Sequence, residues 1–277
     1  MHYHYQQTTR RGRLYNVAKK TTNLKAKKHF GQHFLTSNDT AKTIVEGLGD
    51  ISSQDVLEIG PGMGIITQFM VNDAKRFRAV EIDPEAASYL EQHFDNIALI
   101  KADFLKVNLR DYYTEQFSLI GNFPYNISSQ IVFKIIENTE LVERWVGMFQ
   151  LEMGIRLVAL PKDKKDYGIL SVLTPFYYKV EKIMTLGPEA FNPPPRVNSI
   201  VVKATRVEHQ WKCDPKLLKR VVKTAFGMRR KTLSNGLATI VPKEILNTHQ
   251  FATLRPENLT HLQFEELTAY IEQHVSN

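Results

Sequence analysis

The stretch "DVLEIGPGMG", residues 55–64, decides the fold. Its first half is an apolar run typical of a short buried strand, and its second half is a turn that contains three glycines. Glycine-rich turns between a strand and a helix let backbone N–H groups approach a ligand closely at the helix N-terminus. We therefore predict a strand over residues 55–60, a ligand-binding turn, and a helix over residues 65–71.

Short apolar runs and helical periods continue to alternate along the chain. Further strands are predicted over residues 76–82, 97–101, 117–121, 145–151 and 200–205. Pro84 suits the first turn of a helix, where its missing N–H costs nothing, and Ser128 or Ser129 is expected to cap a helix with an isoleucine-rich face. This alternation predicts an α/β fold with a doubly wound, mostly parallel sheet, in which ligands bind beyond the carboxyl ends of the strands.

The chain divides into three parts by composition. Residues 1–28 carry eight basic and no acidic side chains, which leaves 28 of the 36 basic residues against 29 acidic ones elsewhere. We predict a basic, disordered N-terminal arm over residues 1–28, an α/β domain over residues 29–206 and a small all-helical domain over residues 207–277. A solvated arm and a polyanion-binding arm are compatible interpretations, because disordered basic arms bind nucleic acid.

Composition also argues against several protein classes. Cys213 is the single cysteine, so the chain has no intrachain disulfide and no cysteine-based metal site, as is typical of a reducing compartment. No stretch approaches the roughly 18 uninterrupted apolar residues of a membrane span, and residues 1–13 lack the apolar core of a secretory signal. We expect a cytoplasmic monomer that binds neither metal nor membrane, while the acid-free N-terminus leaves organelle targeting open.

Acidic residues end the second and third predicted strands. Glu81 is placed to accept hydrogen bonds from both hydroxyls of a ribose, and Asp103 to accept one from an adenine amino group. The glycine spacing, Gly60-x-Gly62-x-Gly64, departs from the dinucleotide fingerprint G-x-G-x-x-G. These features favour a nucleoside cofactor without a pyrophosphate, S-adenosylmethionine rather than NAD, although each acid alone would also suit an ordinary loop.

The fourth predicted strand ends in "NFPY", which carries more than a turn needs. The Asn122 side-chain carbonyl and the Phe123 backbone carbonyl can accept the two hydrogens of an adenine amine, which frees its lone pair to attack a methyl sulfonium. Pro124 stiffens the backbone, and Tyr125 offers a ring on which the base stacks. The base must then lie outside any helical stack, and Phe191, in a proline-rich loop, is our candidate for a second ring.

Six motifs occur in an order that resembles a known family. They are "KKHFGQHFL" (27–35), "EIGPGMG" (58–64), "NFPYNISS" (122–129), "DYGILSVL" (166–173), "FNPPPRVNS" (191–199) and "FGMRRKTLSNGL" (226–237). From about residue 27 onward, the chain resembles the ribosomal RNA adenine dimethyltransferases, specifically the bacterial small-subunit enzymes. The resemblance implies a Rossmann-like, S-adenosylmethionine-dependent methyltransferase. Such an enzyme transfers two methyl groups to N6 of each of two adjacent adenines, in a hairpin loop near the 3′ end of 16S rRNA, during late assembly of the small ribosomal subunit.

The resemblance also implies roles for individual residues. It assigns cofactor contacts to His33, Leu35, Gly60, Glu81, Asp103 and Asn122. We add Gly62, because it lies in the same glycine-rich turn as Gly60. It maps Asn122 and Tyr125 onto the acceptor motif and Phe191 onto the stacking ring. The family usually has Leu or Ile where Phe123 stands, and we expect little effect, because only the backbone carbonyl of that residue is needed.

Basic residues of the C-terminal part are expected to contact RNA phosphates. They are Lys219, Arg220 and Lys223 on one helix, followed by Arg229, Arg230 and Lys231. A solvated helix end is the alternative. Relatives that methylate large-subunit RNA and confer macrolide resistance resemble this chain less in this part, where residues 226–237 and 254–264 favour a small-subunit enzyme.

Other functions stay open on the sequence alone. Glutamine methyltransferases that act on release factors use an Asn-Pro-Pro-Tyr motif on an amide nitrogen, but Phe123 replaces one proline here. An assembly factor that binds RNA and uses transfer little would keep the same fold. Intact Glu81, Asp103 and Asn122 argue against lost catalysis, and the glycine spacing makes an NAD enzyme the weakest alternative.

Overall fold

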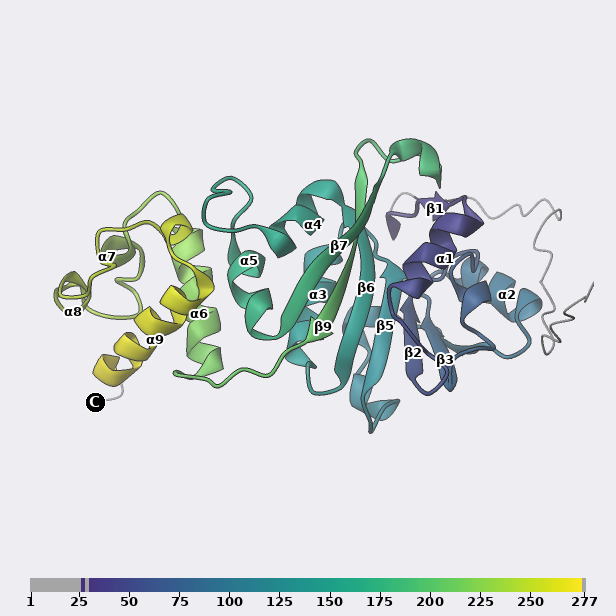
Figure 1. The fold of residues 1–277 in the computed structure, drawn as a ribbon, viewed down its shortest axis with the longest axis horizontal. Helices are drawn as coiled ribbons and strands as arrows, with labels where there is room; N and C mark the ends of the chain where they lie inside the picture. The colour runs from purple at the N-terminus through teal and green to yellow at the C-terminus, as the bar shows by residue number, and fades with distance from the viewer. Residues whose placement is uncertain (1–25, 28–29, 276–277) are drawn as a thin grey trace, which may run out of the picture.

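The computed structural model describes residues 26–27 and 30–275. Its centre is a seven-stranded sheet with the order β4-β3-β2-β5-β6-β9-β7 (Figure 1). The strands are β2 (Asp55–Ile59), β3 (Arg76–Val80), β4 (Ala98–Ile100), β5 (Phe117–Asn122), β6 (Val142–Gln150), β7 (Tyr178–Leu186) and β9 (Ser199–Arg206). The first five strands of that order run parallel, whereas β9 pairs antiparallel with β6 and β7. The predicted doubly wound, mostly parallel sheet is confirmed.

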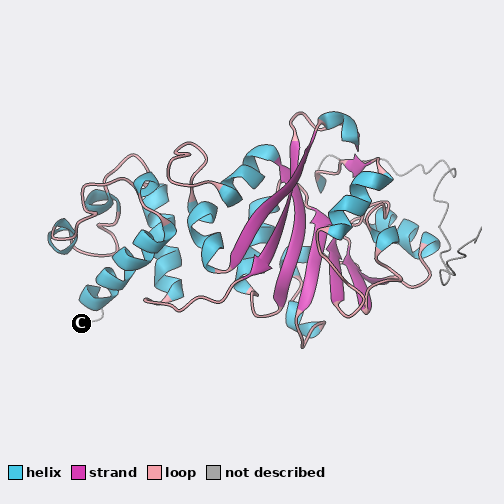
Figure 2. Ribbon diagram, in the orientation of Figure 1, coloured by secondary structure: helices cyan, strands magenta, loops and turns pink. Residues whose placement is uncertain are grey.

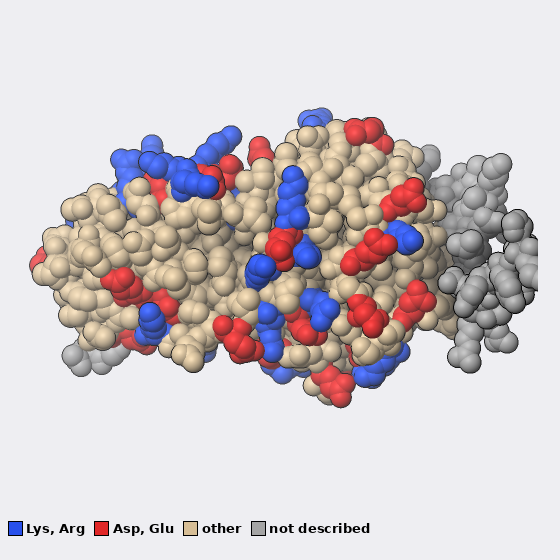
Figure 3. Space-filling model, viewed as in Figure 1, with Lys and Arg blue, Asp and Glu red and all other residues tan. Residues whose placement is uncertain are grey.

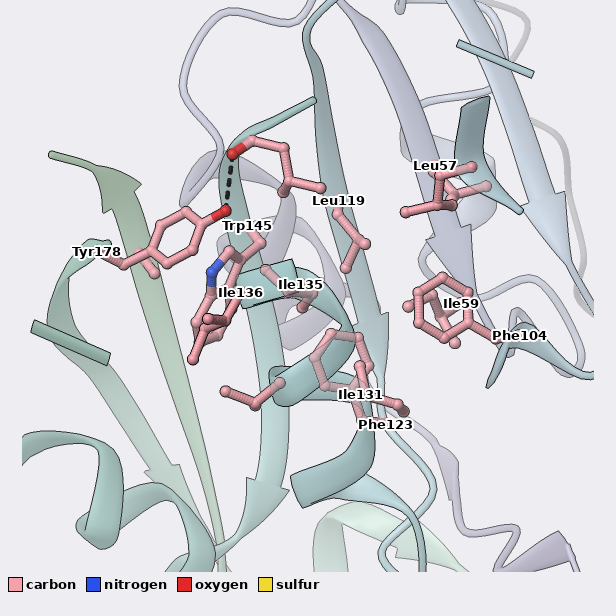
Figure 4. Close-up of a cluster of buried hydrophobic side chains, with 14 of the residues drawn as sticks. Leu57, Ile59, Phe104, Leu119, Phe123, Ile131, Ile135, Ile136, Trp145 and Tyr178 are labelled. Carbon is pink, nitrogen blue, oxygen red and sulfur yellow. Dashed lines mark hydrogen bonds between the residues drawn. The ribbon is translucent and has the colours of Figure 1, made fainter. Parts of the chain in front are cut away.

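Helices cover both faces of this sheet (Figure 2). Helices α1 (Asn38–Glu46) and α2 (Pro84–His93) pack on one face, and α3 (Ser128–Glu137) and α4 (Leu151–Val158) on the other. Neighbouring residues of a strand point to opposite faces of the sheet. Val56 therefore packs with the hydrophobic residues on the side of α1 and α2, and Leu57 with those on the side of α3 and α4. Figure 4 shows Ile131 and Ile135 of α3 close to Leu119 and Trp145 of the sheet. Each such buried side chain stabilises the fold by about 1.5–3 kcal/mol.

The strand order reverses at β2. From β2 the chain builds β3 and β4 on one side, whereas β5 and β6 lie on the other side. The connections therefore leave the carboxyl ends of β2 and β5 in opposite directions, and a crevice opens between them. A second, two-stranded sheet of β1 (Phe34–Leu35) and β8 (Phe191–Asn192) pairs two segments that lie far apart in the sequence.

The C-terminal part is helical, as predicted. It contains α6 (Pro215–Gly227), α7 (Leu233–Gly236), α8 (Lys243–Asn247) and α9 (His261–Val275). The side chain of Asp214 accepts hydrogen bonds from the backbone N–H groups of Lys216 and Leu217 and so caps the start of α6. The hydrophobic cluster formed by these C-terminal helices also contains Tyr167 and Phe176. These residues and the short helix α5 (Ile169–Leu173) precede residue 207, so a domain boundary there stays a prediction.

The helix predicted over residues 65–71 is wrong. Only a single 3-10 turn, Thr67–Phe69, forms within a run of turns. The three glycines before it all have positive φ, with Gly64 at 78°, and a Cβ on Gly64 would lie 2.4 Å from the Phe94 ring. The chain therefore turns sharply at Gly64 and passes close to the end of α2, so no regular helix begins at residue 65.

Two smaller predictions also need correction. The N-cap of α3 is Ile127 without a side-chain cap, because Ser128 already lies in the helix and its hydroxyl donates to the Pro124 carbonyl at 3.0 Å. Strand β7 was not predicted, since its alternating pattern includes the polar residues Lys179, Glu181 and Lys182 on an edge of the sheet.

Most of the predicted N-terminal arm, residues 1–28, lies outside the described residues, apart from Ala26 and Lys27. Among the residues that the structure does describe, none of the helices has both the length and the apolar character needed to cross a membrane.

Gly147 on β6 gives a test of the core. A Cβ there would lie 2.6 Å from the Phe123 ring and 2.7 Å from the Phe149 ring, and both rings are fully buried. We expect Gly147→Ala to lower the free energy of unfolding, measured in urea, by about 1–3 kcal/mol, because neither ring has room to move.

Gly168→Ala is the matched control, since nothing lies within 4 Å of the added Cβ and the backbone is extended at φ −161°. A loss of stability in Gly168→Ala equal to that in Gly147→Ala would contradict this account.

Candidate active site

Two adjoining cavities lie at the carboxyl ends of the parallel strands. The first, of about 310 Å³, is lined by residues that include Gly60, Gly62, Glu81, Ile82, Asp103 and Asn122. The second, of about 460 Å³, is lined by residues that include Tyr125, Gln150, Pro193 and Arg196. Gly31, Gln32 and His33 line both cavities. The first cavity has the size and the mixed apolar and polar lining of a small-molecule site.

The two predicted acidic residues lie in the first cavity, and Glu81 is held rigidly. It is 4% exposed, and its two carboxylate oxygens accept N–H bonds from Asp83 at 2.9 Å and Gly62 at 3.2 Å. Burial raises the pKa of Glu81, and these two bonds only partly offset the effect. Asp103 accepts a bond from the Leu105 backbone at 2.9 Å. Each carboxylate keeps lone pairs for hydroxyl or amine donors of a ligand.

The glycine-rich turn brings backbone to the first cavity. Gly60 has φ 64°, and its Cβ position is open space. Gly62 has φ 58°, and a Cβ there would lie 2.9 Å from the Phe34 ring. Both positions therefore exclude larger residues by conformation, and at Gly62 also by contact.

Glu58 was overlooked in the sequence, although it lies inside the quoted motif. It is 1% exposed, and the Thr67 hydroxyl donates to it at 2.6 Å. Burial raises the pKa of Glu58 to about 8, and the nearby Glu81 charge adds to the rise. Glu58 therefore keeps its proton near neutral pH and contributes an uncharged, hydrogen-bonded side chain beside the crevice.

Residues 30–36, the wall segment, separate the two cavities. Lys27, just before it, pairs with Asp83 at 2.7 Å and Glu85 at 3.0 Å, and Gln32 donates to Asp83 at 3.1 Å. Burial would raise the pKa of Asp83, but the bonds from Lys27 and Gln32 outweigh it and lower that pKa. Asp83 also caps α2. From the sequence only Pro84 was assigned to the start of this helix, and neither the Asp83 cap nor its ion pair was predicted.

Asn122 is oriented by the wall segment. Its side-chain amide nitrogen donates to the His33 backbone carbonyl at 2.8 Å, which leaves the side-chain carbonyl as an acceptor. Phe123 next to it is fully buried and packs edge-on against Phe149 at 5.1 Å. Its ring is therefore part of the core, and only its backbone can serve the site.

Tyr125 lies in the second cavity. Its hydroxyl is hydrogen-bonded to Ser199 at 2.6 Å, and its ring stacks on the His33 ring with centroids 5.4 Å apart. Burial raises the pKa of Tyr125, so the phenol stays neutral. The His33 Nδ1 atom lies 2.8 Å from the Pro193 carbonyl, and this contact joins the wall segment to the proline-rich loop.

Two predicted site residues lie elsewhere. Leu35 and Phe191 are each 4% exposed and pair across β1 and β8. Neither lines the first or the second cavity, although Leu35 lines a small neighbouring cavity with Glu58 and Asn122. A cofactor contact from Leu35 and a stacking role for Phe191 stay predictions.

The six basic residues predicted to contact RNA fall into two groups. Lys219 pairs with Glu137 at 2.5 Å, and Lys223 lies 5.0 Å over the Phe133 ring, so both point toward α3. Arg220, Arg230 and Lys231 are exposed, whereas Arg229 is half-buried and lies 3.7 Å from Glu257.

Comparison with known proteins identifies the relatives of this chain. The family model for ribosomal RNA adenine dimethylase matches residues 23–274. A protein of Bacteroides fragilis named ribosomal RNA small subunit methyltransferase A is 43% identical over 255 residues, which cover 90% of this chain and 93% of that protein. The protein of the same name from Flavobacterium johnsoniae is 44% identical and covers 90% of this chain and 97% of its own length.

Two solved structures of RNA-modifying enzymes are also similar to this chain. The crystal structure of a dimethyladenosine transferase from Plasmodium falciparum has a TM-score of 0.73 at 26% identity, over 87% of this chain and 98% of that chain. The 23S rRNA methyltransferase ErmE has a TM-score of 0.60 at 24% identity, over 88% of this chain and 100% of that chain, which shows a shared fold.

The ion pair of Lys27 gives a test of the wall segment. We expect Lys27→Met to raise the dissociation constant for S-adenosylmethionine several-fold, mainly through faster release, because only the bond from Gln32 then ties the start of the wall segment to Asp83. Stopped-flow binding measures both rates. Lys75→Met, which removes a surface pair with Glu115 at 3.6 Å, is the control, and equal release rates in the two variants would refute the role of Lys27.

The raised pKa of Glu58 predicts a pH effect on stability. The folded protein holds this proton up to about pH 8, whereas the unfolded chain loses it near pH 4.5. The stability that comes from this group is therefore fully present below pH 4.5 and is lost as the pH rises to about 8, by at most about 1.4 kcal/mol per pH unit.

The free energies of unfolding of the wild type and of Glu58→Gln, measured across this range, should diverge, with the wild type falling more steeply. Glu81 titrates in both proteins, so the difference between the two curves reports Glu58 together with its coupling to Glu81. Parallel pH profiles would show that Glu58 is ionised in the folded protein.

Proposed function

The chain belongs to the ribosomal RNA adenine dimethylase family, and from this membership we propose that it methylates small-subunit ribosomal RNA with S-adenosylmethionine as the methyl donor. The acceptors are N6 of two adjacent adenines in a hairpin loop near the 3′ end of 16S rRNA, and each receives two methyl groups during late assembly of the small subunit. The family favours this reaction over glutamine methylation or NAD chemistry. A cytoplasmic monomer stays a prediction.

One observation supports this function above the others. The end of β5 carries Asn122, which lines the first cavity together with Glu81 and Asp103, while Tyr125 three residues later lines the second. A cofactor site and an acceptor site therefore adjoin at a single turn, which is what direct group transfer between two bound molecules requires.

The residues of the first cavity fit S-adenosylmethionine. Glu81 suits the two ribose hydroxyls, Asp103 the adenine amine, and exposed Ile82 one face of the adenine ring. Among the described residues Glu81 has no ion-pair partner, so its carboxylate is available to a ligand in this cavity. When bound, this cofactor supplies a methyl group on a positively charged sulfur.

Asn122 and Phe123 activate the acceptor amine. The Asn122 side-chain carbonyl and the Phe123 backbone carbonyl accept its two hydrogens, so the nitrogen becomes more nearly tetrahedral and its lone pair is freed. The His33 carbonyl keeps the Asn122 amide from turning over. Because no charged base takes part, the proton leaves to solvent after transfer.

Tyr125 holds the flipped base in the second cavity. Its hydroxyl bond to Ser199 fixes the ring, and stacking of one base on a ring stabilises binding by about 1–3 kcal/mol. Outside the cavity, Arg220, Arg230 and Lys231 are exposed and free to meet phosphates, whereas Lys219 must first leave Glu137.

The proposal is tested by transfer of labelled methyl groups to small ribosomal subunits that lack the modification, with large subunits and release factor as parallel acceptors. We expect dimethyladenosine in small-subunit RNA only. Asn122→Ala should lower kcat at least about a hundredfold, because the amine loses one of its two acceptors in the transition state.

Phe123→Leu is the matched control, since it keeps the backbone carbonyl and the apolar character of a buried position. It should retain most of the activity once its stability is confirmed. Label in large-subunit RNA would move the chain to another branch of the family, and full activity of Asn122→Ala would refute the mechanism.

A further inference from the structure

Residues 160–166, which we call the lysine loop, carry charges that sequence analysis did not use. Lys162, Lys164 and Lys165 are all exposed, and Leu160 is 54% exposed. The loop follows α4 and comes before the buried Tyr167. It therefore presents three positive charges and one apolar side chain to solvent.

The lysine loop is an ordered turn. The side chain of Asp163 accepts the Leu160 N–H at 2.9 Å, and its backbone N–H donates to the Leu160 carbonyl at 2.8 Å. The Asp163 carbonyl then accepts N–H bonds from Asp166 at 2.8 Å and Tyr167 at 3.1 Å. These bonds engage one carboxylate within the turn, although Asp163 is itself exposed, and the three lysine side chains are exposed as well.

Contacts from the C-terminal part hold the loop in place. The Tyr167 hydroxyl donates to the Leu259 carbonyl at 2.8 Å, and the Arg229 guanidinium donates to the Lys164 carbonyl. The loop therefore lies beside Arg229, although Arg229 comes 65 positions after Lys164 in the sequence.

Positive charge gathers where these segments meet. Lys162, Lys164, Lys165, Arg230 and Lys231 are exposed, whereas the acids of the two segments are Asp163 and half-buried Asp166, with Glu257 already beside Arg229. Figure 3 shows blue side chains concentrated along this edge, near the end of α6 and the loop after α4. Such a surface attracts phosphates.

The geometry relates this surface to the second cavity. Gln150 lines that cavity and directly precedes α4, whose eight residues lead to the lysine loop and span about 12 Å. Gly154 seats α4 on β9, because a Cβ there would lie 2.1 Å from Ile200. The loop therefore stands at a fixed distance from the base-binding cavity. The length of α4 matches about three or four nucleotides at the roughly 3.4 Å rise of a stacked strand.

We propose that the lysine loop, together with Arg230 and Lys231, binds phosphates of the RNA strand three or four nucleotides from the flipped adenine. This rests on the proposed function. By holding these phosphates, the surface sets the number of nucleotides between them and the base that enters the second cavity. It thereby selects which adenine is presented for methylation. Exposed Leu160 offers an apolar contact for an unstacked base.

The first test is the salt dependence of binding to unmodified small subunits. Changing Lys162, Lys164 and Lys165 together to Gln should weaken binding roughly tenfold or more at low salt and lower the slope of log K against log salt by about 2–3, because each lost phosphate contact removes about 0.7–0.9. Affinity for S-adenosylmethionine should not change.

The control changes Lys42, Lys179 and Lys243 to Gln, which removes the same charge from α1, β7 and α8. A triple lysine-loop variant that binds with the same slope as this control would overturn the proposal.

The second test locates the contact. A photocross-linking benzoylphenylalanine at position 160, in an otherwise unchanged chain, should cross-link to ribosomal RNA within about three or four nucleotides of the methylated adenines. Cross-links only to ribosomal protein, or to distant RNA, would also overturn it. Failure of the proposed function would appear separately, as a wild-type protein that transfers no methyl group to small subunits.

Discussion

The structure depends on one constraint, the parallel pairing of β2 with β5 at the point where the strand order reverses. Both strands end at the same edge of the sheet, so Gly60 and Asn122 line the same cavity although they lie far apart in the sequence. The pairing of β5 with β6 sets Gly121 opposite Gly147, and the ring of Phe123 fills the space that these two glycines leave. A slip of one residue would turn Asn122 to the other face of the sheet. The core therefore determines where the reactive side chain points.

The wall segment completes what the sheet begins. The sheet supplies the carboxylates and Asn122, but the His33 carbonyl fixes the orientation of the Asn122 amide, and the pairing of β1 with β8 ties the segment to the proline-rich loop. Lys27 and Gln32 attach its start to Asp83, which follows Glu81 by two residues. Both cavities therefore share part of their wall, and a shift of the wall segment changes the shape of both.

Most of the sheet could be predicted, because buried strands have a clear apolar pattern and the site residues follow those strands directly. Glu81, Asp103 and Asn122 were found in this way. The turn after Gly64 was misjudged as a helix, because the pattern of residues 65–71 does not reveal the close approach of Phe94. The pair of Lys27 with Asp83 joins residues 56 apart, and no local pattern signals such a contact. Phe191, an aromatic residue beside prolines, packs against the core in this structure, and its stacking role stays a prediction.

The wall shared by the two cavities has a consequence for how successive transfers are ordered. Each transfer leaves a spent cofactor in the first cavity, and Gly31, Gln32 and His33 form part of the wall that holds it there. The same residues bound the second cavity, where the base is held, so a movement that renews the donor also loosens the acceptor. The geometry therefore favours a distributive enzyme, which releases its RNA between rounds, over a processive one. The partly methylated subunit then becomes a free species that must be bound again.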